Sequence, residues 1–326
     1  MINFLNVNSQ KILLKIMKVH YGIESSKDIN NPVVTVGTFD GVHFGHQKII
    51  TRLQKIAKEC NGESVLLTFD PHPRKVLFRD RKIKLINTIK EKINILSNLG
   101  LDHLVIYPFN VEFSNLSAEE YISKLLVNKL KTYTLVIGYD HHFGKNREGN
   151  IQLLKETNKL HPFNLEEIKA HEIDEIKISS TKIRQAIDNG NIHLFKDYCG
   201  RFFEFSGKII YGNGLGKTLG YPTANIEIEN EDKIIPANGV YAVICQLENE
   251  LIHGIMNIGF KPSIEENKIK TIEIHLFEFD KNIYDRYLKI KVLNRIRDEV
   301  KFSSIEKLKI QISKDIKEAQ NIINRN

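Results

Sequence analysis

Residues 32–50 read PVVTVGTFDGVHFGHQKII, and this stretch sets the architecture of the first half of the chain. Its opening residues, 32–37, are a short apolar run that ends in glycine, which is typical of a buried strand. Residues 46–60 follow with apolar side chains at helical spacing. A strand, a glycine-rich turn and a helix in direct succession predict one unit of a parallel α/β sheet.

The same alternation continues along the chain. Strands are predicted at residues 63–69, 103–108 and 134–138, and helices at residues 84–99 and 118–130. This order predicts a parallel sheet covered by helices on both faces. Ligands of such sheets bind at the carboxyl ends of the strands, so we expect functional side chains there.

The pattern changes near residue 200. One more helix is predicted at residues 183–188, and it ends at the turn signal Asn-Gly-Asn. Glycines and prolines then separate short strands, as in a compact β-barrel, at residues 205–211, 241–247, 251–258, 271–279 and 284–292. An amphipathic helix is predicted at residues 305–323. We place the domain boundary within residues 189–202, which gives domains 1–188 and 189–326.

Composition excludes several classes of protein. The 326 residues suit two domains, and 41% hydrophobic residues exclude wholesale disorder. Three distant cysteines without a CxxC pair exclude a disulfide framework and a cysteine zinc site, and they favour the reducing cytoplasm. No stretch approaches the roughly 20 apolar residues of a membrane helix, and the lysine-containing N-terminus lacks the features of a signal peptide.

The net charge of +7 has two interpretations. A nucleic-acid-binding protein would carry basic blocks, whereas the lysines here are interleaved with aspartate and glutamate. The pattern therefore favours a diffuse positive surface without a nucleic-acid partner. Part of the charge could serve anionic small substrates such as nucleotides.

Residues 37–46, GTFDGVHFGH, predict a phosphate site. The glycines let the backbone approach a ligand closely, and the N-terminus of the following helix offers unpaired N–H groups and a partial positive charge. His43 and His46 lie where loop meets helix and can donate hydrogen bonds to phosphoryl oxygens. A histidine metal site lacks a clear third ligand, since His141 and His142 lie in another loop.

A second motif, ISSTKIR at residues 178–184, combines hydroxyl and basic side chains. Its hydroxyl residues, Ser179, Ser180 and Thr181, can cap the helix that follows. With Lys182 and Arg184 beside them, the same residues can hold triphosphate oxygens.

Residues 207–226, GKIIYGNGLGKTLGYPTANI, form another glycine-rich loop after a strand. Its spacing is not that of a Walker P-loop. Thr223 and Asn225 are two residues apart, so an extended segment points both side chains the same way. Their oxygens are hard donors that suit Mg²⁺, and a simple turn is the alternative interpretation.

These motifs together resemble a known family. GTFDGVHFGH and ISSTKIR are similar to the two signatures of the nucleotidyltransferase superfamily, which has a Rossmann-like fold. TFDPHPRK and GYDHHFGKNREG resemble loops of prokaryotic FAD synthetases, although Tyr139 and His141 depart from the commoner pattern. GKTLGYPTANI and EIHLFEFD resemble the riboflavin kinase barrel. Nearly the whole chain is therefore similar to the prokaryotic bifunctional riboflavin kinase/FMN adenylyltransferase family.

The resemblance implies two sites with distinct residues. In the first domain the ATP residues would be Gly37, Phe39, Asp40, Gly41, His43, His46, Ser179, Ser180, Thr181 and Arg184, with both histidines catalytic. The flavin residues there would be His72, Pro73, Arg74, Asp140, Phe143 and Arg147. In the second domain ATP and Mg²⁺ would be held by Gly214, Gly216, Lys217, Gly220, Pro222, Thr223 and Asn225. Glu273 would be the catalytic base, and Arg297 and Glu299 would border the flavin.

The implied function is the synthesis of flavin cofactors. The second domain would phosphorylate riboflavin to FMN with ATP and Mg²⁺, and the first would adenylylate FMN to FAD and release pyrophosphate. Glu273 would take the proton of the riboflavin hydroxyl, whereas the FMN phosphate is already anionic and needs no base. Two alternatives stay open: a kinase whose first domain binds nucleotide or flavin without turnover, and a nucleic-acid-binding protein. We expect a monomer or weak oligomer in the cytoplasm, without a membrane partner.

Overall fold

The computed structural model describes residues 16–26, 28–78, 83–139, 141–159, 163–169, 178–212, 214–261 and 269–326. These residues form two compact units. Unit 1 is built from the described parts of residues 1–38, 47–78 and 93–173, and unit 2 from those of residues 39–46, 79–92 and 174–326. The loop that carries His43 and His46 therefore belongs to the same compact unit as the C-terminal half of the chain.

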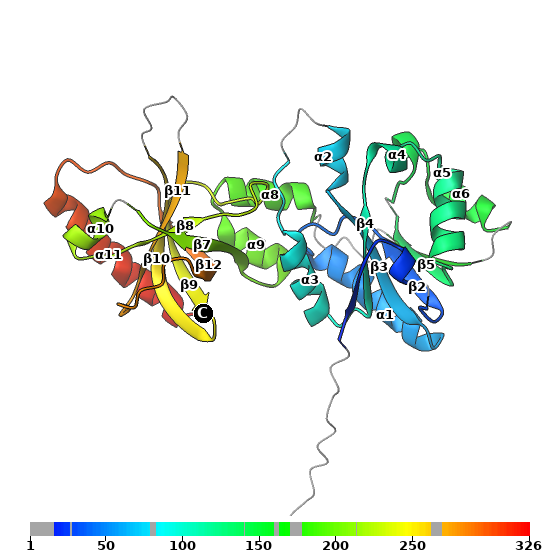
Figure 1. The fold of residues 1–326 in the computed structure, drawn as a ribbon, viewed down its shortest axis with the longest axis horizontal. Helices are drawn as coiled ribbons and strands as arrows, with labels where there is room; N and C mark the ends of the chain where they lie inside the picture. Colours follow the sequence, from blue (N-terminus) through cyan, green and yellow to red (C-terminus); the bar gives the residue numbers. More distant parts are fainter. Residues whose placement is uncertain are drawn as a thin grey trace, which may run out of the picture. The chain divides into compact units, whose positions relative to one another are not determined.

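Unit 1 contains a parallel sheet with the strand order β1-β4-β3-β2-β5-β6 in the described part of the chain (Figure 1). Its strands are β1 (Lys18–Tyr21), β2 (Pro32–Val36), β3 (Glu63–Asp70), β4 (His103–Pro108), β5 (Thr134–Gly138) and β6 (Asn164–Ile168). Val34 and Val65 pack into a helix-covered core on one face, and Val33 and Leu66 are buried on the other. Burial of both faces confirms the predicted parallel α/β sheet.

The first half of the chain contains mostly short helices. They are η1 (Glu24–Ser26), α1 (Phe44–Glu59), α2 (Pro73–Leu77), α3 (Ile89–Asn98), α4 (Val111–Ser114), α5 (Ala118–Glu120), the π-helical η2 (Tyr121–Lys129), η3 (Lys145–Arg147) and α6 (Ile151–Thr157). The helix predicted at residues 84–99 begins only at Ile89. Leu85 instead forms an isolated β-bridge with Lys233, and the helix begins after Thr88, whose hydroxyl accepts the N–H of Glu91 at 3.2 Å as a cap.

Unit 2 contains a closed antiparallel barrel with the strand order β10-β11-β8-β7-β12-β9 (Figure 1). Its strands are β7 (Phe203–Ile210), β8 (Ala224–Glu227), β9 (Gly239–Leu247), β10 (Glu250–Lys261), β11 (Ile269–Leu276) and β12 (Tyr287–Arg297). The helices of the second half are α8 (Ser180–Asp188), α9 (Ile192–Cys199), α10 (Leu215–Leu219) and α11 (Ile305–Asn324). The predicted barrel and its final helix are confirmed, while β8, α9 and α10 were not predicted.

Side chains of β11 alternate between the two faces of the barrel wall. Ile272, Ile274 and Leu276 belong to the buried core of the barrel. Because successive strand residues point to opposite faces, Glu273 and His275 lie on the outer face. The barrel therefore has a packed interior, and polar chemistry is possible on its outside.

We predict that the contact between α11 and the barrel depends on a buried ion pair. Arg297 donates from Nε and Nη2 to the carboxylate of Asp315, which is 3% exposed. Asp315→Asn should lower the free energy of unfolding by about 2 kcal/mol. This is less than the roughly 3–5 kcal/mol of a fully buried pair, because Arg297 is partly exposed. Urea denaturation measures the loss, and Glu250→Gln, which removes an exposed partner of Lys281, should change stability by less than about 0.5 kcal/mol.

Candidate active sites

The first candidate site begins at the carboxyl end of β2. The strand order reverses at β2, since β3 and β4 lie on one side of it and β5 and β6 on the other. Open α/β sheets bind ligands outside the carboxyl ends of the strands at such a reversal. Gly37 follows β2 directly, donates its N–H to Leu67 O at 3.0 Å, and leads into the glycine-rich loop.

The backbone of this loop is strained. Phe39, Gly41 and Val42 have φ values of 44°, 88° and 37°, in the left-handed region that favours glycine. A Cβ on Gly41 would also lie 3.0 Å from Cδ1 of Ile86, so any other residue would crowd that side chain in addition to straining the backbone. For the non-glycine residues Phe39 and Val42, such a conformation costs about 1–3 kcal/mol each and persists only where surrounding contacts enforce it.

His43 and His46 form a stacked pair in this loop. Their ring centroids are 3.7 Å apart, and the ring of Phe39 stacks on His46 at 4.5 Å. Within the described residues, Nδ1 of each histidine is buried without a hydrogen-bond partner. Buried polar atoms are normally paired, so two orphaned nitrogens side by side are what a site for an absent phosphoryl ligand would show.

Both imidazoles are neutral at pH 7. The pKa of His43 is lowered to about 4, mainly by burial and also by the Arg201 cation, while the charge of Asp40 opposes the shift. Burial also holds the pKa of His46 well below its usual value, with additional contributions from His43, Lys92 and Arg201. A neutral ring has one N–H donor and one acceptor, so each histidine can donate one hydrogen bond to an anionic oxygen.

The two nucleotidyltransferase-like motifs meet at Asp40. Ser180, the first residue of α8, donates to the Asp40 backbone oxygen at 2.8 Å, and Arg184 pairs with the Asp40 carboxylate. Ser179 caps α8 by accepting the N–H of Lys182, and Thr181 is exposed. Residues 140 positions apart in sequence are thus brought into direct contact.

Asp40 organises the loop from a buried position. Its carboxylate is 1% exposed and accepts N–H groups from Ile86 at 3.1 Å and Asn87 at 2.9 Å. Arg184 also donates to Lys84 O at 2.7 Å. Asp40 and Arg184 therefore fix the shape of the site, because both already have protein partners.

The residues expected beside the flavin lie in unit 1 and take varied positions. His72 caps α2 by accepting the N–H of Arg74, Pro73 is the first residue of α2, and Arg74 is exposed. Phe143 is 7% exposed and packs against Tyr121 with ring centroids 5.2 Å apart, so it forms part of the core. Arg147 is exposed, and Asp140 lies outside the described residues.

The second candidate site lies at the loop around α10. Gly214 and Gly220 flank this helix with φ values of 71° and 87°, which only glycine adopts readily. A Cβ on Gly216 would lie 2.4 Å from Tyr221 O and 3.1 Å from the hydroxyl of Thr223, and one on Gly212 would lie 2.0 Å from Nδ2 of Asn225. The glycines therefore allow the loop backbone to lie directly against Thr223 and Asn225, and Lys217 is exposed on this loop.

Three polar side chains from the neighbouring strands β8, β11 and β10 lie in a row on the outer face of the barrel, near this loop. Glu273 of β11 lies opposite Asn225 of β8 and opposite Asn257 of β10. Residues directly opposite in antiparallel strands have Cβ atoms roughly 4.5–5.5 Å apart. A carboxylate flanked by two amides is therefore built by strand register, although no role was predicted for Asn257 from its place in the sequence.

His275 is a second residue that sequence reasoning missed. It lies two residues beyond Glu273 on the same face, and its Nδ1 is 2.8 Å from Pro222 O. The ring of Tyr221 meets it edge-on at 5.6 Å. His275 thereby holds the Pro222–Thr223 turn against β11.

The donor set near Glu273 fits magnesium. No group of three or more histidine, cysteine, aspartate or glutamate residues in the described part of the chain could hold a metal ion. Thr223 and Asn225 instead offer a hydroxyl and an amide oxygen at the loop. Mg²⁺ prefers oxygen ligands and commonly binds through few protein groups together with substrate phosphates and water.

Arg297 and Glu299, expected at the flavin of the second site, have other contacts here. Arg297 is bound to Asp315. Glu299 accepts a hydrogen bond from Nδ2 of Asn238 at 3.2 Å, and a Cβ on Gly259 would lie 2.3 Å from its Oε1. Gly259 belongs to β10, the strand that also carries Asn257. Glu299 therefore lies close to the part of the outer face that carries Asn257.

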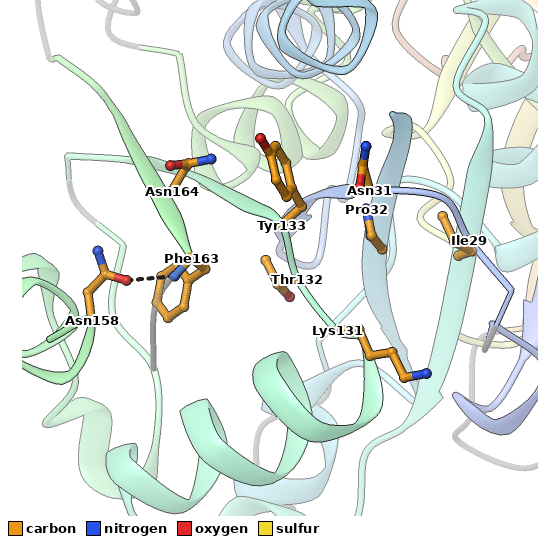
Figure 2. A pocket seen from close by; sticks show the side chains of 9 residues that line it. All are labelled: Ile29, Asn31, Pro32, Lys131, Thr132, Tyr133, Asn158, Phe163 and Asn164. Carbon is orange, nitrogen blue, oxygen red and sulfur yellow. Dashed lines mark hydrogen bonds between the residues drawn. The ribbon is translucent and has the colours of Figure 1, made fainter. Parts of the chain in front are cut away.

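A hollow of about 650 Å³ lies at the other end of the strands, at the amino ends of β2, β5 and β6 (Figure 2). It is lined by Ile29, Asn31, Pro32, Lys131, Thr132, Tyr133, Asn158, Phe163 and Asn164. Asn158 accepts the N–H of Phe163 at 2.8 Å. Figure 2 draws this hydrogen bond as a dashed line. The hollow contains no buried ionisable side chain and lies away from the carboxyl ends, so it is not an active-site candidate.

Two family models match the chain. The model described as FAD synthetase matches residues 25–182, and the model described as riboflavin kinase matches residues 199–323. In the described residues, no helix combines the length and apolar character needed to cross a membrane.

Curated relatives match over most of their length. A bifunctional riboflavin kinase/FMN adenylyltransferase of Buchnera aphidicola from Schizaphis graminum is 44% identical over 305 residues, 92% of this chain and 97% of its own. The proteins of the same name from Bacillus subtilis and Escherichia coli K12 are 38% and 32% identical over 88% and 87% of this chain, and over 91% and 90% of their own. A solved structure from Streptococcus pneumoniae, titled a macrolide-efflux protein, superposes with a TM-score of 0.83 at 28% identity, covering 93% of this chain and 99% of that one.

Proposed function

This chain belongs to the family of bifunctional riboflavin kinase/FMN adenylyltransferases, and we propose that its two activities are divided between residues 1–188 and 189–326. The enzyme phosphorylates riboflavin to FMN with ATP, and it adenylylates FMN to FAD with a second ATP. The observation that carries the division is that each half has its own polar site: the paired histidines at residues 43 and 46, and the carboxylate of Glu273 between two amides.

In the adenylylation site, a phosphate oxygen of FMN attacks the α-phosphorus of ATP, and pyrophosphate leaves. The anionic nucleophile needs no base. His43 and His46 are catalytic as N–H donors that stabilise the charge developing on the transferred phosphoryl group. Their neutral state and unpaired buried nitrogens support this role.

Other residues of the first site bind and orient the substrates. Gly37, Phe39, Gly41, Ser179 and Thr181 are proposed to border ATP, while Asp40, Ser180 and Arg184 hold the loop around it. The FMN side is proposed to involve His72, Pro73, Arg74, Asp140, Phe143 and Arg147. Exposure of Arg74 and Arg147 supports an anion-binding role for these two side chains.

In the kinase site, Glu273 accepts the proton of the ribityl 5′-hydroxyl as its oxygen attacks the γ-phosphorus of ATP, and ADP leaves. Thr223 and Asn225 would hold Mg²⁺, which when bound neutralises phosphate charge. The loop with Gly214, Gly216, Lys217, Gly220 and Pro222 is proposed to enclose the phosphates, and Arg297 and Glu299 to border the flavin. The close fit of glycine backbone against Thr223 and Asn225 supports this arrangement.

We further propose that the enzyme works in the cytoplasm as a monomer or weak oligomer, without a nucleic-acid partner. Its three cysteines are not joined in disulfides, which suits a reducing compartment. Barrel lysines are paired with acidic side chains, Lys289 with Glu204 and Lys208 with Asp285, which supports a surface of interleaved charges.

Magnesium dependence tests the donor set of the kinase site. Thr223→Val keeps the shape of the side chain and removes its hydroxyl, so the Mg²⁺ concentration for half-maximal riboflavin phosphorylation should rise about 10- to 100-fold. Thr223→Ser, which keeps the hydroxyl, should stay within about threefold of the parent protein. Equal magnesium dependence in both variants would show that Thr223 is not a ligand.

A further inference from the structure

Three consecutive residues of unit 2 contact the loop of residues 39–46, here called the histidine loop. None of the three belongs to a motif of the adenylylation site. Cys199 Sγ lies 3.5 Å from Gly41 O. Gly200, at the end of α9, is so close to Phe44 that a Cβ there would lie 2.9 Å from its ring. Arg201 makes the most extensive contact of the three.

Arg201 binds two segments, the histidine loop itself and the segment of residues 86 and 87, whose N–H groups hold Asp40. Its Nη2 donates to Gly41 O at 2.8 Å and to Oδ1 of Asn87 at 3.3 Å, and its Nη1 donates to Val42 O at 3.3 Å. Nη1 also lies 3.5 Å from Cys199 O, and the guanidinium lies 5.3 Å from the centroid of the Phe195 ring. A planar guanidinium with five donors suits such a set of fixed acceptors, and lysine does not replace it.

The segment of residues 86 and 87 is itself held in place by Lys233. Lys233 is 3% exposed, and its Nζ donates to Ile86 O at 2.7 Å and to Glu204 O of β7 at 3.0 Å, and pairs with Glu91 at 2.6 Å. Residues 86 and 87 are therefore fixed to the start of the barrel. Arg201, two residues before β7, ties the histidine loop to the same place.

The loop needs such an anchor because of its backbone. Gly41 and Val42, whose carbonyls accept from Arg201, have positive φ and directly precede His43. A left-handed valine is unfavourable by itself and relaxes when its restraints are removed. We propose that Arg201 is a positioning residue for adenylylation, which holds the loop in the conformation that presents His43 and His46 to the phosphoryl group. The proposal rests on the function given above for the two histidines.

The test uses the full chain with Arg201→Gln, Arg201→Lys and, as control, Arg286→Gln, which changes an exposed arginine paired with Glu248. Arg201→Gln should lower kcat for FAD formation from FMN about 100-fold, the effect of displacing catalytic groups by roughly 1 Å. Riboflavin phosphorylation should stay within about twofold. Arg201→Lys should give a smaller, still several-fold loss of FAD formation, and Arg286→Gln should lose neither activity.

An NMR titration of the histidine rings separates positioning from general destabilisation. Loss of the Arg201 cation should raise the pKa values of His43 and His46, with Asp40 and Lys92, the other charges that face the pair, unchanged. Arg201→Lys keeps the positive charge, so the two pKa values should stay near those of the parent protein. Its several-fold loss of FAD formation would then be due to the changed geometry of the loop.

Wild-type FAD formation in Arg201→Gln, or an equal loss of both activities in that folded protein, would overturn the proposal. If Arg201→Gln does not fold, Arg201→Lys decides: a several-fold loss of FAD formation with normal phosphorylation supports the anchor, and full FAD formation rejects it. A parent protein that makes no FAD in the same assay would instead contradict the function of the site, so the two failures are distinguishable.

Discussion

Replacing His46 with alanine should reduce FAD formation from FMN and ATP by about 10²- to 10³-fold, the effect of removing one preorganised donor to a developing charge. FMN formation from riboflavin should be unchanged, because Glu273 and its neighbours lie on the barrel and share no residue with the histidine pair. Chromatography of flavins measures both rates after separate incubations of the protein with riboflavin and ATP or with FMN and ATP. The size of the effect follows from the position of His46 between the rings of Phe39 and His43 and from its buried Nδ1, where water cannot easily replace the lost N–H.

A second variant separates the donor from the ring. His46→Phe keeps an aromatic ring in the stack but removes both nitrogens, so it should be as defective in FAD formation as the alanine variant. His193→Ala, which changes an exposed histidine of α9, is the matched control and should keep both activities. A His46→Phe protein with normal FAD formation would show that His46 only supports the loop.

Glu273→Gln should have the other large effect, a loss of riboflavin phosphorylation of about 10²- to 10⁴-fold, which is the usual contribution of a general base. Glutamine has the same shape and keeps an oxygen between Asn225 and Asn257, but it cannot accept the hydroxyl proton. Supplied FMN should still be converted to FAD at the normal rate. Assays with riboflavin and with FMN as separate substrates give the two numbers.

The control for this change is Glu250→Gln, another barrel glutamate, which is exposed and paired with Lys281. It should leave riboflavin phosphorylation within about twofold. Near-normal phosphorylation by Glu273→Gln would assign the base to another group. A parallel loss of FAD formation from FMN would mean that the variant has damaged the whole protein.

Sequence pattern predicted the frame of the molecule because buried strands and amphipathic helices have distinct periods. The strand at residues 32–37 and the barrel strands from residue 203 onward are the strongest examples. β8 was missed because it has only four residues and follows directly on the Pro222 turn. α9 was missed because the Asn-Gly-Asn signal ends α8 but does not exclude a new helix one residue later.

The motifs predicted candidate residues for the chemistry but not the residues that hold these candidates in place. His43, His46 and Ser180 belong to motifs, and the structure brings Ser180 to the backbone of the histidine loop. Arg201 and Lys233 belong to no motif, since their partners are backbone carbonyls that lie far away in sequence. Asn257 depends on the register of β10 with β11, which sequence alternation cannot specify. Contacts of this kind follow from the tertiary fold alone.

The most direct test of two separate sites in one chain is a time course of flavin chromatography with riboflavin, ATP and Mg²⁺. The parent protein should form FMN first and FAD from it. His46→Ala should accumulate FMN, Glu273→Gln should leave riboflavin unchanged, and a mixture of the two variants should restore FAD. A mixture that makes no FAD from riboflavin, although each variant retains its remaining activity alone, would contradict the division of the two reactions between independent sites.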